Sequence, residues 1–173
     1  MAGLWPAGWD RPAAAVVPAP LILTVALPAA LQRAADAVRG KLAPEAAAHA
    51  PAHLGLFRHL PGLRVADIEA DVRAVANGPA PAFRLGEPEP WSGLWVMPAH
   101  SRALEDLREA LAERWHGLLA APDAGRPKLH ISLSKGREAP PALPAGPWTA
   151  QGLLIWQYDQ TFWRPLVACR FRR

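Results

Sequence analysis

The chain has 173 residues, of which 51% are hydrophobic, so it can bury a sizeable core in one domain or in two small lobes. Its formal net charge of +4 is a mild basic excess, which is compatible with an anionic substrate and also with an ordinary solvated surface. The single cysteine, Cys169, excludes a disulfide within the chain and a cysteine-based zinc site. It favours a reducing compartment, and we therefore expect a cytoplasmic protein.

The first twenty residues contain four prolines and no unbroken apolar segment, which argues against a signal peptide. We expect residues 1–20 to form a flexible or loosely docked arm, with Trp5 and Trp9 as its possible anchors. The longest apolar run, at 21–27, has only seven residues and is too short to cross a membrane. We therefore expect a single domain over residues 21–173 that does not interact with a membrane.

The run at 21–27 is rich in β-forming residues and predicts a buried strand. Pro28 then opens a predicted helix, which has apolar residues at helical spacing. They are Leu31, Ala35, Val38 and Leu42. After a loop of alanine and histidine, the stretch AHLGLFRHLPG at 52–62 predicts a second strand, which begins at His53.

A second helix is predicted before the stop signal Asn77-Gly78, from Ile68, Val72 and Val75. The segment AFRLGE at 82–87 is a candidate strand, and GLWVMP at 93–98 predicts a short strand that ends in proline. The most regular helix follows, and KLHISLSKG at 128–136 then alternates like a strand. The apolar face of that helix would be Leu104, Leu107, Leu111, Trp115 and Leu118.

The order strand, proline, helix, loop and histidine strand therefore occurs twice, and His53 and His130 occupy matching positions. Each unit is too small to bury its apolar faces alone, so we expect the two to pack as a pseudo-symmetric pair. The alternative is a chance similarity between two βαβ units. The chain ends in two β-like runs, at 148–158 and 162–172, which predict a hairpin.

The two histidine strands suggest a chemical use. Under an approximate twofold, His53 and His130 would face each other across a groove. Because imidazole has an unperturbed pKa of about 6.5, one ring can act as a base and the other as an acid on opposite sides of a phosphorus atom. Alternation places Ser132 on the face of His130, where its hydroxyl could donate to a phosphate oxygen. The predicted faces are His53, Gly55, Phe57 and His59 on one strand, and His130, Ser132 and Ser134 on the other.

Other residues near these strands allow two interpretations each. Lys135 could guide an anionic substrate or could be solvated charge, as could Lys128 and Arg137. Tyr158 lies near the predicted hairpin turn, where an aromatic ring could stack on a base. Arg58 should point away from the groove in a regular strand. A metal site at His49 and His53 is disfavoured because no carboxylates complete the ligand set.

Two short motifs carry a resemblance to a known family. HISL at 130–133 has the form His-x-Thr/Ser-x in full, and HLGL at 53–56 has it except at Gly55, where threonine or serine is expected. Together with the duplicated order of elements and the terminal hairpin, residues 21–172 resemble the 2H phosphoesterases. Within that superfamily they are similar to the 2′-5′ RNA ligase-like, or RNA 2′,3′-cyclic phosphodiesterase, proteins.

The resemblance implies an α+β, bilobal fold in which duplicated βαβ units with antiparallel sheets surround a central groove. It also implies that His53 and His130 are the acid/base pair and that Ser132 is a phosphate donor. The implied partner is an RNA or nucleotide with a cyclic phosphate. Catalysis would use no cofactor and no metal, and we expect a monomer.

Gly55 is the departure from the family pattern, and losing one preorganised donor can cost on the order of 10²–10³ in rate. Three interpretations remain open. The Gly55 N–H or a water replaces the hydroxyl, the site accepts a bulkier substrate, or catalysis is degraded. The last interpretation gives an alternative function, a non-catalytic nucleotide- or RNA-binding protein on the same scaffold.

Overall fold

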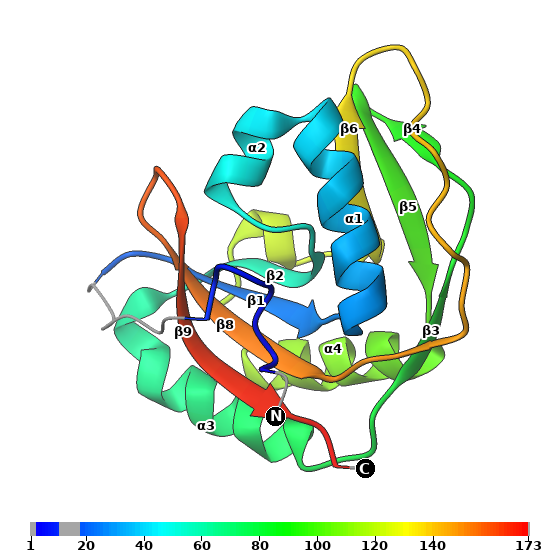
Figure 1. Ribbon diagram of the computed structural model, residues 1–173. Helices are drawn as coiled ribbons and strands as arrows, with labels where there is room; N and C mark the ends of the chain where they lie inside the picture. The colour runs from blue at the N-terminus through cyan, green and yellow to red at the C-terminus, as the bar shows by residue number, and fades with distance from the viewer. Residues whose placement is uncertain (1–2, 11–17, 173) are drawn as a thin grey trace.

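A computed structural model describes residues 3–10 and 18–172, so part of the predicted arm lies outside the described residues. The chain alternates strands and helices, with two short 3₁₀ turns (Figure 1). The elements are β1 (Leu21–Ala26), α1 (Ala29–Leu42), α2 (Pro44–His49), β2 (Leu54–Leu60), η1 (Gly62–Arg64), α3 (Val65–Ala76), β3 (Ala82–Leu85), β4 (Glu89–Trp91), β5 (Leu94–His100), α4 (Arg102–Arg114), η2 (Ala121–Asp123), β6 (His130–Lys135), β7 (Trp148–Thr149), β8 (Gly152–Tyr158) and β9 (Trp163–Arg170).

The strands form one antiparallel sheet in the order β7-β3-β5-β6-β2-β1-β8-β9, with β4 paired to β5. The two histidine strands, β2 and β6, are neighbours near its centre. On their outer sides lie β1 and β5, the strands that open the two predicted units. The predicted α+β fold, in which both strand–helix–strand units contribute antiparallel strands, is confirmed.

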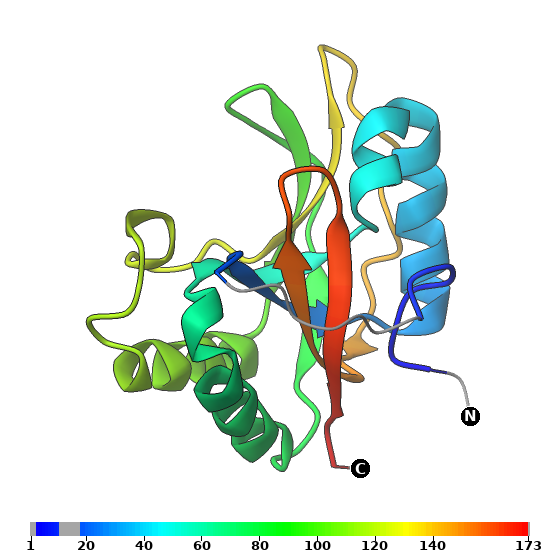
Figure 2. The ribbon, with the colours of Figure 1, turned by 90° about the vertical axis from the view of Figure 1, so that its left-hand side faces the viewer.

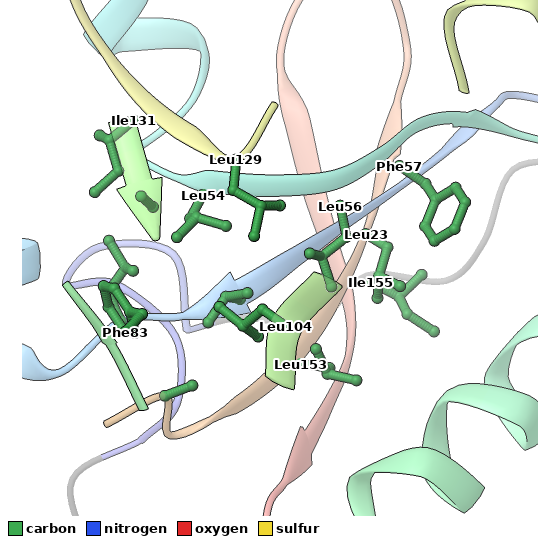
Figure 3. Close-up of a cluster of buried hydrophobic side chains, with 14 of the residues drawn as sticks. Leu23, Leu54, Leu56, Phe57, Phe83, Leu104, Leu129, Ile131, Leu153 and Ile155 are labelled. Atoms are coloured by element: carbon green, nitrogen blue, oxygen red, sulfur yellow. The ribbon is translucent and has the colours of Figure 1, made fainter. Parts of the chain in front are cut away.

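The helices cover the sheet from two sides. Figure 2 shows the strands between the α1–α2 pair and the α3–α4 pair. The main core brings together side chains from both units, because the central strands are apolar on the faces that the helices cover. Leu54 and Ile131, which pair across β2 and β6, lie in this core, as does Leu104 of α4 (Figure 3).

A smaller apolar cluster centres on the fully buried Trp156. Trp5 and Trp9 pack on this indole edge to face, with ring centroids 4.8 Å and 5.9 Å away. The cluster comprises Ile22, Ala26, Leu154 and Trp156, with Leu4, Trp5, Trp9, Trp163 and Ala168 packed against it. Residues 3–10 therefore contact the body of the domain.

Three local predictions were wrong. The predicted loop before His53 contains α2, because Pro44 starts a helix and the alanines after it favour one. The helix predicted to reach Leu118 ends at Arg114, and Gly117 follows with a φ of 84° that breaks the helical path. Pro98 does not end its strand, since β5 continues to His100.

No helix among the described residues is long and apolar enough to span a membrane.

Candidate functional site

The register of β2 on β6 brings the two histidine motifs together. Leu54 pairs with Ile131 in an antiparallel ladder. Continuing that register by one residue sets His53 opposite Ser132 and Gly55 opposite His130. Side chains alternate along a strand, so these four positions share the face opposite to that of the Leu54–Ile131 pair. All four line one cavity of about 440 Å³.

The two histidines are held in the same way. The Nδ1 atom of His53 lies 2.8 Å from the carbonyl oxygen of Pro51, and that of His130 lies 2.6 Å from the carbonyl oxygen of Lys128. Each carbonyl belongs to the residue two positions earlier. A carbonyl can only accept a hydrogen bond, so Nδ1 carries the hydrogen in both rings. In the neutral form, Nε2 is then the basic nitrogen.

A tryptophan packs on each histidine ring. Trp163 of β9 has its ring centroid 4.4 Å from that of His53, and Trp91 of β4 has its centroid 4.8 Å from that of His130. From the sequence, Trp163 was, like Tyr158, an open candidate for stacking on a base near the hairpin turn, and Trp91 was not considered. Strand β4 has only three residues, which is too short for a periodic signal.

The environment of His53 disfavours its charged form. Burial lowers the pKa of His53 to about 4, and repulsion from Arg39 and His130 acts in the same direction. The hydrogen bond to Pro51 opposes this shift but does not offset it. At neutral pH, His53 is therefore neutral and can accept a proton.

Arg39 links the site to the helices. From α1, its Nη1 donates to the carbonyl of Ser132 at 3.2 Å, and its Nη2 donates to the carbonyls of Ala46 and Ala50 at 3.2 and 3.1 Å. Burial lowers the pKa of the guanidinium, although the Asp36 carboxylate opposes that shift. The side chain thus fixes the backbone of the second motif and places positive charge near it.

Arg58 lines the cavity, contrary to the regular alternation that turned it away. The register of β1 on β2 shifts twice, and Leu56 and Phe57 are both buried as a result. Phe57 therefore belongs to the core. The prediction that it shares the face of His53 was wrong. The Asp123 carboxylate holds the irregular segment by accepting the N–H groups of Arg58 and His59, both at 2.8 Å.

Arg108 of α4 completes this support. Its guanidinium lies 4.5 Å from the centroid of the Phe57 ring and donates to the carbonyl of Asp123. Arg126 and Lys128 also line the cavity, and the Lys128 ammonium lies 5.6 Å from the Trp91 ring centroid. Sequence spacing alone could not show that η2 returns to β2 and brings its basic neighbours to the histidines.

Two predicted residues line different cavities. Tyr158 lines the cavity with the histidines, whereas Lys135 lines a second cavity beside Arg39. Val96 pairs with Ser132 and Trp95 pairs with Ser134, so the ladder skips one residue of β6 at this point. This bulge turns Ser134 to the face opposite Ser132, and the prediction that the two share a face was wrong.

Within residues 3–10 and 18–172, no group of three or more His, Cys, Asp or Glu side chains could hold a metal ion.

A model of the 2′-5′ RNA ligase superfamily matches residues 27–161, which include both histidine motifs. The chain belongs to this superfamily. The resemblance found in the sequence is thereby confirmed, and membership supports an activity of the phosphoesterase type. A search of curated proteins gives no significant match.

Solved structures support the superfamily fold. TT0787 of Thermus thermophilus is 22% identical, with a TM-score of 0.68 over 88% of this chain and 98% of its own. E. coli LigT complexed with NADP+ is 17% identical, with a TM-score of 0.63. LigT complexed with 3′-AMP is 21% identical, with a TM-score of 0.59. Each LigT comparison covers 90% of this chain and 99% of LigT.

Proposed function

We propose that this superfamily member is a metal-independent phosphoesterase that opens the 2′,3′-cyclic phosphate of an RNA end or a nucleotide. One observation carries the proposal. The Leu54–Ile131 pair sets two histidines in matched positions of one cavity, and each is anchored through Nδ1 so that Nε2 is the reactive nitrogen. That arrangement suits a reaction that needs one base and one acid at a single phosphorus.

In the proposed reaction, His53 is the base because its lowered pKa keeps it neutral. It takes a proton from water as the water oxygen attacks phosphorus. The bond from phosphorus to one ribose oxygen breaks, and protonated His130 gives its proton to that oxygen. The product is a ribose phosphomonoester, and each histidine has exchanged its protonation state for the other's. Proton transfers then restore the starting forms.

Other lining residues supply binding in this proposal. The Ser132 hydroxyl donates to a non-bridging oxygen, where negative charge develops. Arg58, Arg126 and Lys128 attract the anionic substrate, and Tyr158 offers an exposed ring on which a base can stack. Nucleotides in the complexes of LigT, with 3′-AMP and with NADP+, support a ligand of this class.

A non-catalytic nucleotide- or RNA-binding protein is the second candidate, and Gly55 favours it. A Cβ atom built at Gly55 would meet no atom within 4 Å, so the first motif leaves open space where a hydroxyl is expected. The position opposite His130 therefore lacks the donor that Ser132 supplies opposite His53. If that donor is indispensable, the cavity would bind a phosphate ester without cleaving it.

The test is turnover of an oligonucleotide that ends in a 2′,3′-cyclic phosphate, with EDTA present. The proteins compared are the wild type, His130→Ala and His116→Ala, the last being an exposed histidine outside the cavity. Turnover that His130→Ala loses and His116→Ala retains would support the phosphoesterase. Saturable binding without turnover would support the second candidate. If the wild type shows no turnover and no binding, both candidate functions are contradicted.

A further inference from the structure

The wall behind His53 belongs to the small cluster around Trp156. Ile22 and Trp163 line the site cavity and are also members of that cluster. Trp163 lies at the first position of β9, where it pairs with Tyr158 beside the hairpin turn. A side chain beside an exposed hairpin turn needs support from elsewhere to keep one orientation. The cluster provides that support.

Four ring contacts connect the N-terminal segment to His53. Trp5 and Trp9 each pack on Trp156, the centroid of Trp156 lies 5.7 Å from that of Trp163, and Trp163 lies against His53. The indole of Trp156 is fully buried, and its Nε1 donates to the Thr24 hydroxyl at 2.9 Å. The central ring of the series is therefore fixed from both sides.

Most of the rings in this series lie outside the part of the chain that matches the superfamily. The matched range is 27–161, so Trp5, Trp9 and Trp163 all lie outside it. In Figure 1, the dark blue segment that carries Trp5 and Trp9 passes over β8, the strand of Trp156. Contacts that start outside the matched range thus end on a histidine inside it.

We propose that residues 3–10 are a positioning element of the site, in which Trp5 and Trp9 act through Trp156 to hold Trp163 against the His53 ring. Only its consequence for turnover rests on the proposed function. The held indole keeps water from one side of the imidazole while the Pro51 carbonyl fixes Nδ1. The orientation of Nε2 is then set before any ligand arrives.

The experiment is a proton NMR titration of the histidine ring signals in the wild type and in the double variant Trp5→Ala/Trp9→Ala. Released from its support, Trp163 should admit water to His53, and the titration midpoint of His53 should rise by about one pH unit or more. Arg39 and His130 are the charged groups that act on His53, and neither is altered. The midpoint of His130 should stay unchanged, because its ring packs on Trp91.

Trp148→Ala is the matched control, since this indole binds the Pro144 carbonyl and is not in the cluster around Trp156. It should move neither midpoint. Thr24→Val is a milder second variant that keeps shape but removes the hydrogen bond to Trp156, and it should raise the His53 midpoint by a smaller amount. If the double variant does not fold, Thr24→Val decides.

An unchanged His53 midpoint, or equal movement of both histidines, would overturn the proposal. No substrate is needed for this measurement, so its outcome is separate from that of the turnover test. If turnover is also observed in the wild type, the double variant should lower kcat about tenfold or more with little effect on KM.

Discussion

Leu54 pairs with Ile131, and this register sets His53 opposite Ser132 and His130 opposite Gly55. Each histidine thus has the third residue of the other motif as its cross-strand neighbour. The neighbour of His53 is Ser132, which has a hydroxyl, whereas the neighbour of His130 is a glycine. The symmetry of the backbone is therefore greater than that of the chemistry, and the two sides of the cavity can be tested separately.

Restoring the missing hydroxyl is the first test. Gly55→Thr should fold normally, because the added Cβ meets no atom within 4 Å and the backbone at this position is not left-handed. We expect turnover of the cyclic phosphate to rise about tenfold or more, as one further donor stabilises the developing charge. Steady-state kinetics measures this. Gly55→Ala is the control, since it fills the space without a donor. A fall in both variants would instead indicate that the substrate occupies this space.

The roles of the two histidines can be separated with the leaving group. A p-nitrophenyl ester of a nucleoside phosphate needs no proton on its departing oxygen. His130→Ala should keep about a tenth or more of the wild-type rate on that ester while losing on the order of 10²–10⁴ on the cyclic phosphate. His53→Ala should lose activity on both, because the base is needed in each case. The reverse pattern would exchange the two assignments.

Stability should depend on pH through His53. Its pKa is about 4 in the folded protein and 6.5 as a free side chain, so the unfolded chain binds a proton between these values that the folded protein does not. Stability therefore falls as the pH drops from 6.5 to 4, by about 3 kcal/mol at most, and this contribution is constant below 4. Urea unfolding at several pH values gives the free energy of unfolding as a function of pH. Between pH 4 and 6.5, this free energy should change less steeply with pH in His53→Gln than in the wild type. An identical slope in the two proteins would contradict the lowered pKa.

Arg58 offers a test of substrate charge. Arg58→Ala should raise KM about tenfold and change kcat less than about twofold, because the side chain attracts the anion but does not react. The dependence of KM on salt should also weaken. His59→Ala is the neighbouring control, being exposed and not part of the cavity lining. A kcat effect as large as the KM effect would give Arg58 a part in the chemical step.

Periodicity was enough to predict β2, which begins directly after His53, and β6, which begins at His130, because the apolar residues of each run are buried in the core. The same reasoning failed where a ladder skips a residue. The register shifts in β2 and β6 turned Arg58 toward the cavity and Ser134 away from it. The shifted segment of β2 is held by a tertiary partner, the Asp123 carboxylate, which lies more than sixty positions from the N–H groups that it binds.

The tryptophans of the site were harder still to predict. Trp91 lies on a three-residue strand, and Trp163 reaches His53 only because β8 pairs with β1 and carries β9 beside it. Neither contact has a local signature. The histidines can be found in the sequence from a repeated motif. The positions of the tryptophan rings beside them depend on how distant strands are ordered in the sheet.

The order of the strands also affects when the site forms during synthesis. Both histidine motifs have been made once residue 133 is added, yet the indole that packs on His53 comes thirty residues later, on the last strand of the sheet. The β2–β6 pair, which does not include β9, can therefore form before Trp163 is in place against His53. The histidine pair would be assembled first and enclosed later, when the β8–β9 hairpin docks on β1.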